Sequence, residues 1–207
     1  MSARIAPVVT SALPDLERYL TAFPGKAHEA ARIAINYAAD GPALKLLRAG
    51  IQAQIAFPTG YLNDPSKIRV SSHATNANLV ASVSTRQRAT SLARFAAAAY
   101  PQPKGTPLAV TVRPGHTETL KGAFLVRLRR GASVSEDNFN VGLAVRLKPG
   151  DSLRNVKSGR TVQLDKNLFL LYGPSIDQVF DEVAEEQSDA IGSEVASEFT
   201  RQLARLT

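Results

Sequence analysis

The chain has 207 residues and no cysteine, and its 25 Lys and Arg against 18 Asp and Glu give a formal net charge of +7. The lack of cysteine excludes disulfides and thiolate metal sites. No apolar run approaches the roughly 18 residues that span a bilayer, and the N-terminus lacks the pattern of a secretory signal, so we expect a soluble protein made in a cytoplasm.

The first quarter of the chain predicts helices, over residues 12–57. A short amphipathic segment ends at Pro24-Gly25, and a longer Ala-rich segment follows with apolar residues near a 3.6-residue period. Asp40-Gly41-Pro42 interrupts this second segment. Because Asp is a good N-cap and Pro is tolerated in a first helical turn, we expect a kink or a restart there.

Residues 66–172 predict a β-rich region, because apolar and polar residues alternate in short segments separated by turn residues. Within 122–131, apolar side chains occupy one face of the expected strand, and Arg127 and Arg129 lie on the other. This pattern predicts a half-buried strand with a solvated, cationic face. Two segments rich in Pro, Gly or polar residues are expected to be loops: 96–107 and 148–163.

Residues 174–206 predict one long amphipathic helix that begins at Pro174, a residue suited to a first helical turn. Its acidic residues lie mainly in the first half, and Arg201 and Arg205 lie in the last turns, which suits the helix dipole. The apolar residues recur every three to four positions, with Gln187 at the one weak step. They are candidates for a subunit interface: Ile176, Phe180, Val183, Ile191, Val195, Phe199 and Leu203.

These patterns together predict a single α+β domain over residues 1–207. It has N-terminal helices, a central and mostly antiparallel β-sheet or sandwich, and the long C-terminal amphipathic helix. The charge is divided unevenly: residues 1–176 hold 23 basic and 10 acidic residues, and residues 177–207 hold 2 and 8. Such a division fits either a basic body that faces a polyanion or a soluble surface with uneven charge.

The turn at Gly173-Pro174-Ser175 is interpreted as a joint between the sheet and the last helix. Its sequence does not match the G-x-S-x-G nucleophile elbow, and Ser175 is expected to accept a backbone hydrogen bond near the helix start. The three histidines, His28, His73 and His116, show no zinc spacing. No phosphate-binding glycine motif occurs. We therefore predict no catalytic residue, no metal and no cofactor.

Basic residues gather along the predicted strands and could share one face of a sheet. Such a face could contact the phosphates of a nucleic acid without contacting its bases, or it could contact a neighbouring protein. A solvated face, or salt bridges to a neighbouring subunit, explains the pattern at least as well. The candidates that face DNA or a partner are Arg86, Arg88, Arg127, Arg129, Arg130 and Arg146.

Four pieces of the sequence, in this order, give the chain a likeness to a known family. They are "AARIAINYAADGPALKLLRAGIQAQIAFPTGYLNDPSKIRV", "SLARF" (91–95), "GAFLVRLRRG" and "LFLLYGPSIDQVFDEV". In these features the chain resembles the minor tail protein Z (tail completion) family of tailed bacteriophages. Pro42 in the long helix and the Pro-containing segment 96–107 depart from the family pattern. The motif residues are Gly60, Tyr61, Leu62, Gly122, Ala123, Phe124, Tyr172, Gly173, Pro174 and Ser175.

The resemblance implies a virion structural protein at the head-proximal end of the tail, made in the host cytoplasm, without enzymatic activity or cofactor. It implies a ring-shaped homo-oligomer, a hexamer or dodecamer, on the tail axis. Its expected partners are other tail or neck proteins and, without sequence specificity, genomic DNA, but no membrane. Two alternatives stay open: a basic α+β nucleic-acid-binding module, and, more remotely, a hydrolase that uses Ser175 or His116.

Overall fold

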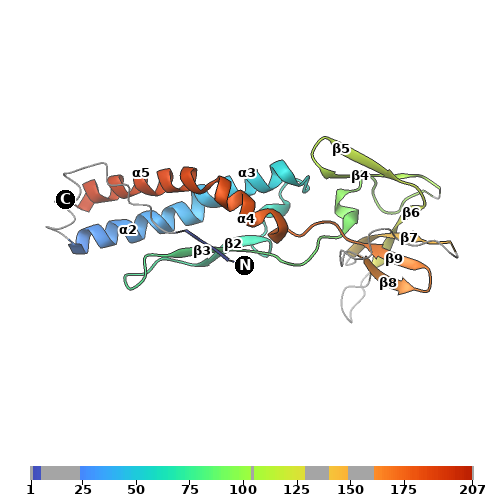
Figure 1. The fold of residues 1–207 in the computed structure, drawn as a ribbon, viewed down its shortest axis with the longest axis horizontal. Coiled ribbons are helices and arrows are strands. Elements are labelled where there is room, and N and C mark those ends of the chain that lie inside the picture. The colour runs from blue at the N-terminus through green and yellow to red at the C-terminus, as the bar shows by residue number, and fades with distance from the viewer. Residues whose placement is uncertain (1, 6–23, 104, 129–139, 149–160, 207) are drawn as a thin grey trace. The chain divides into compact units, whose positions relative to one another are not determined.

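The computed structural model describes residues 2–5, 24–103, 105–128, 140–148 and 161–206 (Figure 1). The α+β class is confirmed, with long helices and antiparallel sheets. The short amphipathic helix expected before Pro24 and the candidates Arg129 and Arg130 lie outside the described residues. Two compact units make up the chain, so the expectation that residues 1–207 act as a single domain stays a prediction. We call them the helical unit (1–51, 62–86 and 177–207) and the sheet unit (52–61 and 87–176).

The first long helix runs through the point where the sequence predicts a kink or restart. It consists of α2 (Pro24–Ala38), a π-helical turn (Ala39–Ala43) and α3 (Leu44–Gln54). Pro42 lies inside the π-helical turn. Because Pro has no N–H to donate to the preceding turn, a local widening keeps the chain helical where an α-helical hydrogen bond is impossible. The irregularity is therefore real, but it takes the form of a π-turn.

The core of the helical unit is formed mainly by small side chains between helices and a three-stranded sheet. The helix α2 packs along the C-terminal helix, as the blue and red ribbons of Figure 1 show. The sheet has the order β1-β3-β2 and is antiparallel, with β1 (Ser2–Ile5), β2 (Ile68–Ser72) and β3 (Ala81–Thr85). One buried cluster joins helices and sheet: Ile35, Ala38, Ala39, Ala74, Ala81 and Val195. Alanines allow the helix backbones to come close to the sheet.

The sheet unit contains a hairpin and a four-stranded antiparallel sheet. The hairpin pairs β4 (Leu108–Arg113) with β5 (His116–Leu120). The strand β5 is not apparent from the sequence, because its residues are almost all polar and exposed, which hides the strand period. The larger sheet has the order β6-β7-β9-β8. Its strands are β6 (Ala123–Leu128), β7 (Asn140–Arg146), β8 (Thr161–Asp165) and β9 (Leu168–Leu171).

The C-terminal helix differs from the prediction in its start and in its continuity. It begins at Asp177 rather than Pro174 and is divided into α4 (Asp177–Glu186) and α5 (Ser188–Leu206). The division falls at Gln187, where its N–H donates to the Val183 carbonyl (3.0 Å) and its own carbonyl accepts from Ile191 (2.9 Å). Helical hydrogen bonding therefore continues across the weak step. No helix in the described ranges is long and apolar enough to cross a bilayer.

A buried carboxylate stabilises the last turns of α5. Glu198 is 6% exposed and accepts hydrogen bonds from Arg201 Nε (2.7 Å) and Nη2 (2.6 Å) and from Gln202 Nε2 (2.5 Å). The Arg201 guanidinium also lies 5.9 Å from the ring centroid of Tyr37 on α2. The hydrogen bonds from Arg201, helped by Gln202, lower the pKa of Glu198 below its ordinary value. The charged pair lies within α5, and its Arg201 guanidinium links α5 to α2 through the contact with Tyr37.

Replacing Glu198 with Gln is expected to lower the free energy of unfolding near neutral pH by about 1 kcal/mol, because charge-assisted hydrogen bonds are lost while water screens the half-exposed Arg201. Since the folded-state pKa of Glu198 lies below 4.5, the wild-type advantage is fully present above that pH and disappears as pH falls through the folded-state pKa. Urea unfolding at several pH values measures this. Glu194→Gln, at an exposed position of the same helix, is the control. An advantage that persists unchanged in acid contradicts the assignment.

Two glycines in helices differ in the space around them. A Cβ at Gly50 would lie 2.5 Å from Cγ1 of Val183, whereas a Cβ at Gly192 would meet nothing within 4 Å. Gly192→Ala is therefore expected to stabilise the protein by about 0.5–1 kcal/mol through helix propensity. Gly50→Ala gains the same propensity but is expected to be about 1–3 kcal/mol less stable than Gly192→Ala, because Val183 is displaced. Thermal or urea unfolding measures both variants, and equal stabilisation would contradict close α3–α4 packing.

Candidate functional site

Three of the four family-like pieces meet in one buried cluster of the sheet unit. We call it the joint cluster: Phe57, Tyr61, Thr90, Phe95 and Gly173. The rings of Phe57 and Tyr61 are stacked, with centroids 5.0 Å apart and an interplanar angle of 18°. The ring of Phe57 also lies 5.4 Å from that of Phe95. Segments that are far apart in the sequence thus share one apolar contact surface.

Backbone hydrogen bonds close the joint cluster around Thr90, which is 2% exposed. The Gly173 N–H donates to the Thr90 carbonyl (2.7 Å), and the Thr90 N–H donates to the Pro174 carbonyl (3.3 Å). The hydroxyls of Thr90 and Tyr61 lie 3.3 Å apart. All three polar groups of Thr90 are therefore paired, as buried polar groups require. This pairing also explains why the helix begins after Pro174. The Pro174 carbonyl accepts a hydrogen bond from Thr90 instead of one from within the helix.

Gly173 is required at the joint for steric reasons. A Cβ at this position would lie 2.8 Å from Cε2 of Phe95, closer than side chains approach one another. The neighbouring Ser175 is only 6% exposed. A buried hydroxyl beside a packed glycine is poorly presented to a substrate, so the geometry supports the interpretation of this turn as a joint. The expected capping hydrogen bond of Ser175 stays a prediction.

The histidines lie apart and take local partners. His28 Nε2 lies 2.7 Å from the Asn76 carbonyl oxygen, and His73 Nε2 lies 2.9 Å from an Asp40 carboxylate oxygen. His116 is exposed, 3.6 Å from Glu118. Across the described residues, no group of three or more His, Asp or Glu side chains could hold a metal ion.

Two of the basic candidates, Arg127 and Arg146, belong to neighbouring strands of the four-stranded sheet. Arg127 on β6 lies directly opposite Val141, and Arg146 on β7 lies opposite Leu168 of β9. Residues opposite each other share a face and neighbours along a strand alternate, so Arg127 and Arg146 lie on opposite faces of the sheet. Arg86 belongs to the helical unit and Arg88 to the sheet unit. The expectation of a shared cationic face on these strands is therefore wrong for Arg127 and Arg146.

The apolar candidates for a subunit interface are mostly covered by the chain itself. Phe199 and Leu203 are partly buried. The other five are at most 5% exposed: Ile176, Phe180, Val183, Ile191 and Val195. They have found partners within the chain, so their periodicity reflects packing within the protein and does not require a second subunit. Phe199 and Leu203, which are only partly buried, stay candidates for a subunit interface.

One surface groove adjoins the third family-like piece. It has a volume of about 600 Å³ and lies between residues 102–103 and 105–107 on one side and the start of β6 on the other. Gly122, with a φ of 75° that suits glycine, turns the chain into β6, and Ala123 and Phe124 line the groove. Across it, the Gln102 side chain accepts a hydrogen bond from the Leu125 N–H (3.0 Å). We call this the β6 groove.

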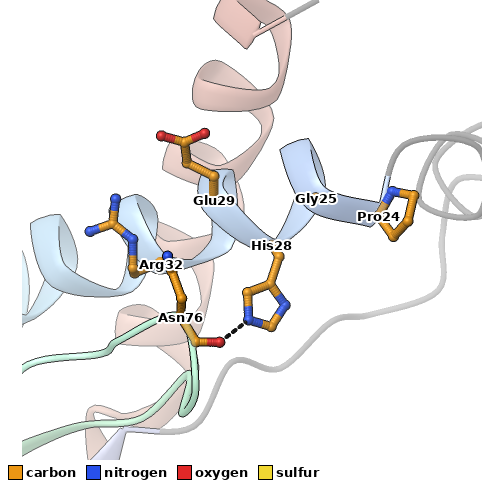
Figure 2. A pocket seen from close by; sticks show the side chains of 6 residues that line it. All are labelled: Pro24, Gly25, His28, Glu29, Arg32 and Asn76. Atoms are coloured by element: carbon orange, nitrogen blue, oxygen red, sulfur yellow. Dashed lines mark hydrogen bonds between the residues drawn. The ribbon is translucent and has the colours of Figure 1, made fainter.

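A second cavity, of about 480 Å³, lies in the helical unit at the start of α2. Figure 2 shows His28 pointing toward Asn76, whereas Glu29 and Arg32 project to another side. Arg32 Nε is buried without a hydrogen-bond partner, but its side chain is partly exposed. Because the polar side chains that line this cavity diverge, they do not form the convergent set that binds a small ligand.

Comparisons with known proteins found no match for this chain among family models, curated proteins or solved structures. The likeness to the tail completion family therefore rests on the four quoted pieces. The structure adds that three of them contribute to the joint cluster and that the piece beginning at Gly122 lines the β6 groove. Neither the joint cluster nor the groove can be predicted from the sequence alone, because each depends on contacts between segments that are distant in the sequence.

The hydrogen bond between Tyr61 and Thr90 can be measured by a double-mutant cycle. Tyr61→Phe and Thr90→Val each remove one hydroxyl from a buried pair and are expected to destabilise the protein by about 1–2 kcal/mol. The double variant is expected to be more stable than the sum of the two losses predicts, by about 0.5–1.5 kcal/mol, because the second change leaves no partner unpaired. Urea unfolding of the four proteins gives the coupling energy. Strict additivity would show that the two hydroxyls do not interact.

Proposed function

We propose that the chain is a structural protein of a tailed bacteriophage virion, a tail completion or head–tail joining component that forms a ring on the tail axis. It acts by self-association and by contact with other tail or neck proteins, and it has no catalytic role. The observation that carries the proposal is the meeting of Tyr61, the segment 91–95 and Gly173 in one cluster. If the four pieces belong to one inherited fold, its core should bring them together, and three of the four meet in this cluster.

The four-stranded sheet supplies a second support for the proposal. Among the described residues, its outer strands β6 and β8 pair on one side only, and the two outer edges differ in sequence. The β8 edge carries Val162 and Leu164, which are 47% and 46% exposed. A ring is built from a repeated contact between two different surfaces of the same molecule. Unpaired sheet edges with exposed apolar side chains are surfaces of this kind.

We expect DNA to be at most a weak binding partner of this chain. Arg127 and Arg146 lie on opposite faces of the sheet, so no continuous cationic face on these two strands is available to follow a duplex. DNA that passes through such a ring would meet scattered positive charge, and binding by the isolated chain is expected to be weak and to fall steeply with added salt. Tight, salt-sensitive duplex binding by a monomer would favour the nucleic-acid-binding module instead.

The experiment that tests the proposal measures the mass of the purified full chain by light scattering, alone and mixed with tails that lack it. A species of six or twelve copies is expected, and electron microscopy should place it at the head-proximal end of those tails. Phage that lack the gene should give unfinished tails. A chain that stays monomeric at all concentrations and does not bind the tails, together with infectious particles in its absence, would overturn the proposal.

A further inference from the structure

The four-stranded sheet contains an apolar row that ends at both outer edges. Val162 lies opposite Leu170, Leu170 opposite Ala144, and Ala144 opposite Phe124, so all four share one face. The two middle residues are buried, at 3% and 0% exposed. At one end Val162 is 47% exposed, and at the other end Phe124 lines the β6 groove. The row is therefore apolar up to both of its ends.

One hydrogen bond shows which backbone groups of the edge strands β6 and β8 point outward from the sheet. The Leu125 N–H points away from β7, because it donates to the Gln102 side chain. In an antiparallel sheet, successive residues direct their backbone groups to alternate sides. This alternation can be followed from β6 across the pairing registers of β7, β9 and β8. It places the backbone N–H and C=O groups of Val162 on the side of β8 that faces β9. The groups of Thr161 and Gln163 then face outward from β8.

We propose that strand β8 of a second copy of this chain pairs antiparallel with the outer edge of β6. This contact rests on the proposed function and identifies the surface by which the ring closes. The four strands alternate in direction, so β6 and β8 run oppositely. A copy added in the same orientation therefore places its β8 antiparallel to β6, with the same face of the sheet on the same side. The contact joins two different edges, as a closed ring requires.

The register of the contact is set by the apolar row. With the second copy's Val162 opposite Phe124, the row continues from one subunit into the next and the exposed Val162 is covered. The same register places Thr161 opposite Leu125, and both have outward backbone groups. The Leu125 N–H, which donates to the Gln102 side chain in the single chain, then donates to the Thr161 carbonyl of the second copy. Gln102, which also donates to the Thr106 carbonyl (2.6 Å), acts as a removable cap on the β6 edge.

The chain contains no cysteine, so any disulfide that forms must join introduced cysteines. Within one chain Phe124 and Val162 are three strand spacings apart, about 14 Å, too far for a disulfide. In the proposed contact they form a non-hydrogen-bonded pair at about 4.5 Å between Cα atoms. The Phe124→Cys/Val162→Cys double variant is expected to give a ladder of covalent oligomers on mild oxidation. Each single variant should stay uncrosslinked. Dimers of Val162→Cys alone, or of Phe124→Cys alone, would show a pairing of like edges and overturn the proposal.

Substitutions on the two edges test the contact without crosslinking. Replacing both Val162 and Leu164 with Lys is expected to raise the dissociation constant of self-association at least about tenfold, because charge on an edge strand prevents edge pairing. Thr119→Lys, which adds the charge to an exposed position of β5, is the control. Gln102→Ala is expected to lower the dissociation constant, since it removes the cap. Folding of each variant is checked by circular dichroism.

The outcomes separate this contact from the proposed function. Rings that form equally well in the Val162→Lys/Leu164→Lys variant, while the double-cysteine variant gives no ladder, would overturn the β6–β8 contact and leave the ring itself standing. A wild-type chain that never self-associates, alone or on tails, would overturn both. Weaker association on Gln102→Ala, with folding intact, would show that Gln102 is part of the contact rather than a cap and would also contradict the proposal.

Discussion

The backbone pairing of Thr90 with Gly173 and Pro174 is the constraint on which the sheet unit depends. It holds the chain that leaves β9 against a loop from a distant part of the sequence. Because Gly173 has no side chain, the ring of Phe95 can lie directly over it. Phe95 in turn contacts Phe57, and Phe57 stacks on Tyr61. One pair of hydrogen bonds and one missing Cβ thereby position the end of the four-stranded sheet.

The elements with strong periodicity could be predicted from the sequence. The long helices and most strands lie where the apolar spacing places them, because a buried face imposes its period on the residues that form it. The strand β5 could not be predicted, since its polar residues bury no face. The start of α4 at Asp177 could not be predicted either: Pro174 suits a first helical turn, but its carbonyl accepts a hydrogen bond from Thr90. Tertiary pairing overrides local preference there.

Whether the candidate arginines share a face depends on the pairing register of their strands, which the sequence of a single strand does not reveal. Arg127 and Arg146 each lie at an exposed position of an alternating strand, and the sequence predicts a common face for them. The observed register of β6 and β7 places them on opposite faces, and a shift by one residue would have reversed that result. The apolar residues of the last helix show a related limit. Their spacing indicates a buried face, but it does not distinguish a face buried by the same chain from one buried by another.

A different alternation, that of strand direction, gives the four-stranded sheet two outer edges that run oppositely. With four alternating strands the outer two run oppositely, so like-oriented copies meet antiparallel; with five, the meeting strands would run parallel. A sheet of this kind would add copies without control if both edges were bare, and natural proteins protect such edges. Here one glutamine side chain satisfies the Leu125 N–H and also binds its own loop. A cap made of a single side chain costs little to displace compared with a backbone ladder and an apolar row, so in the proposed contact it would weaken self-association without preventing it.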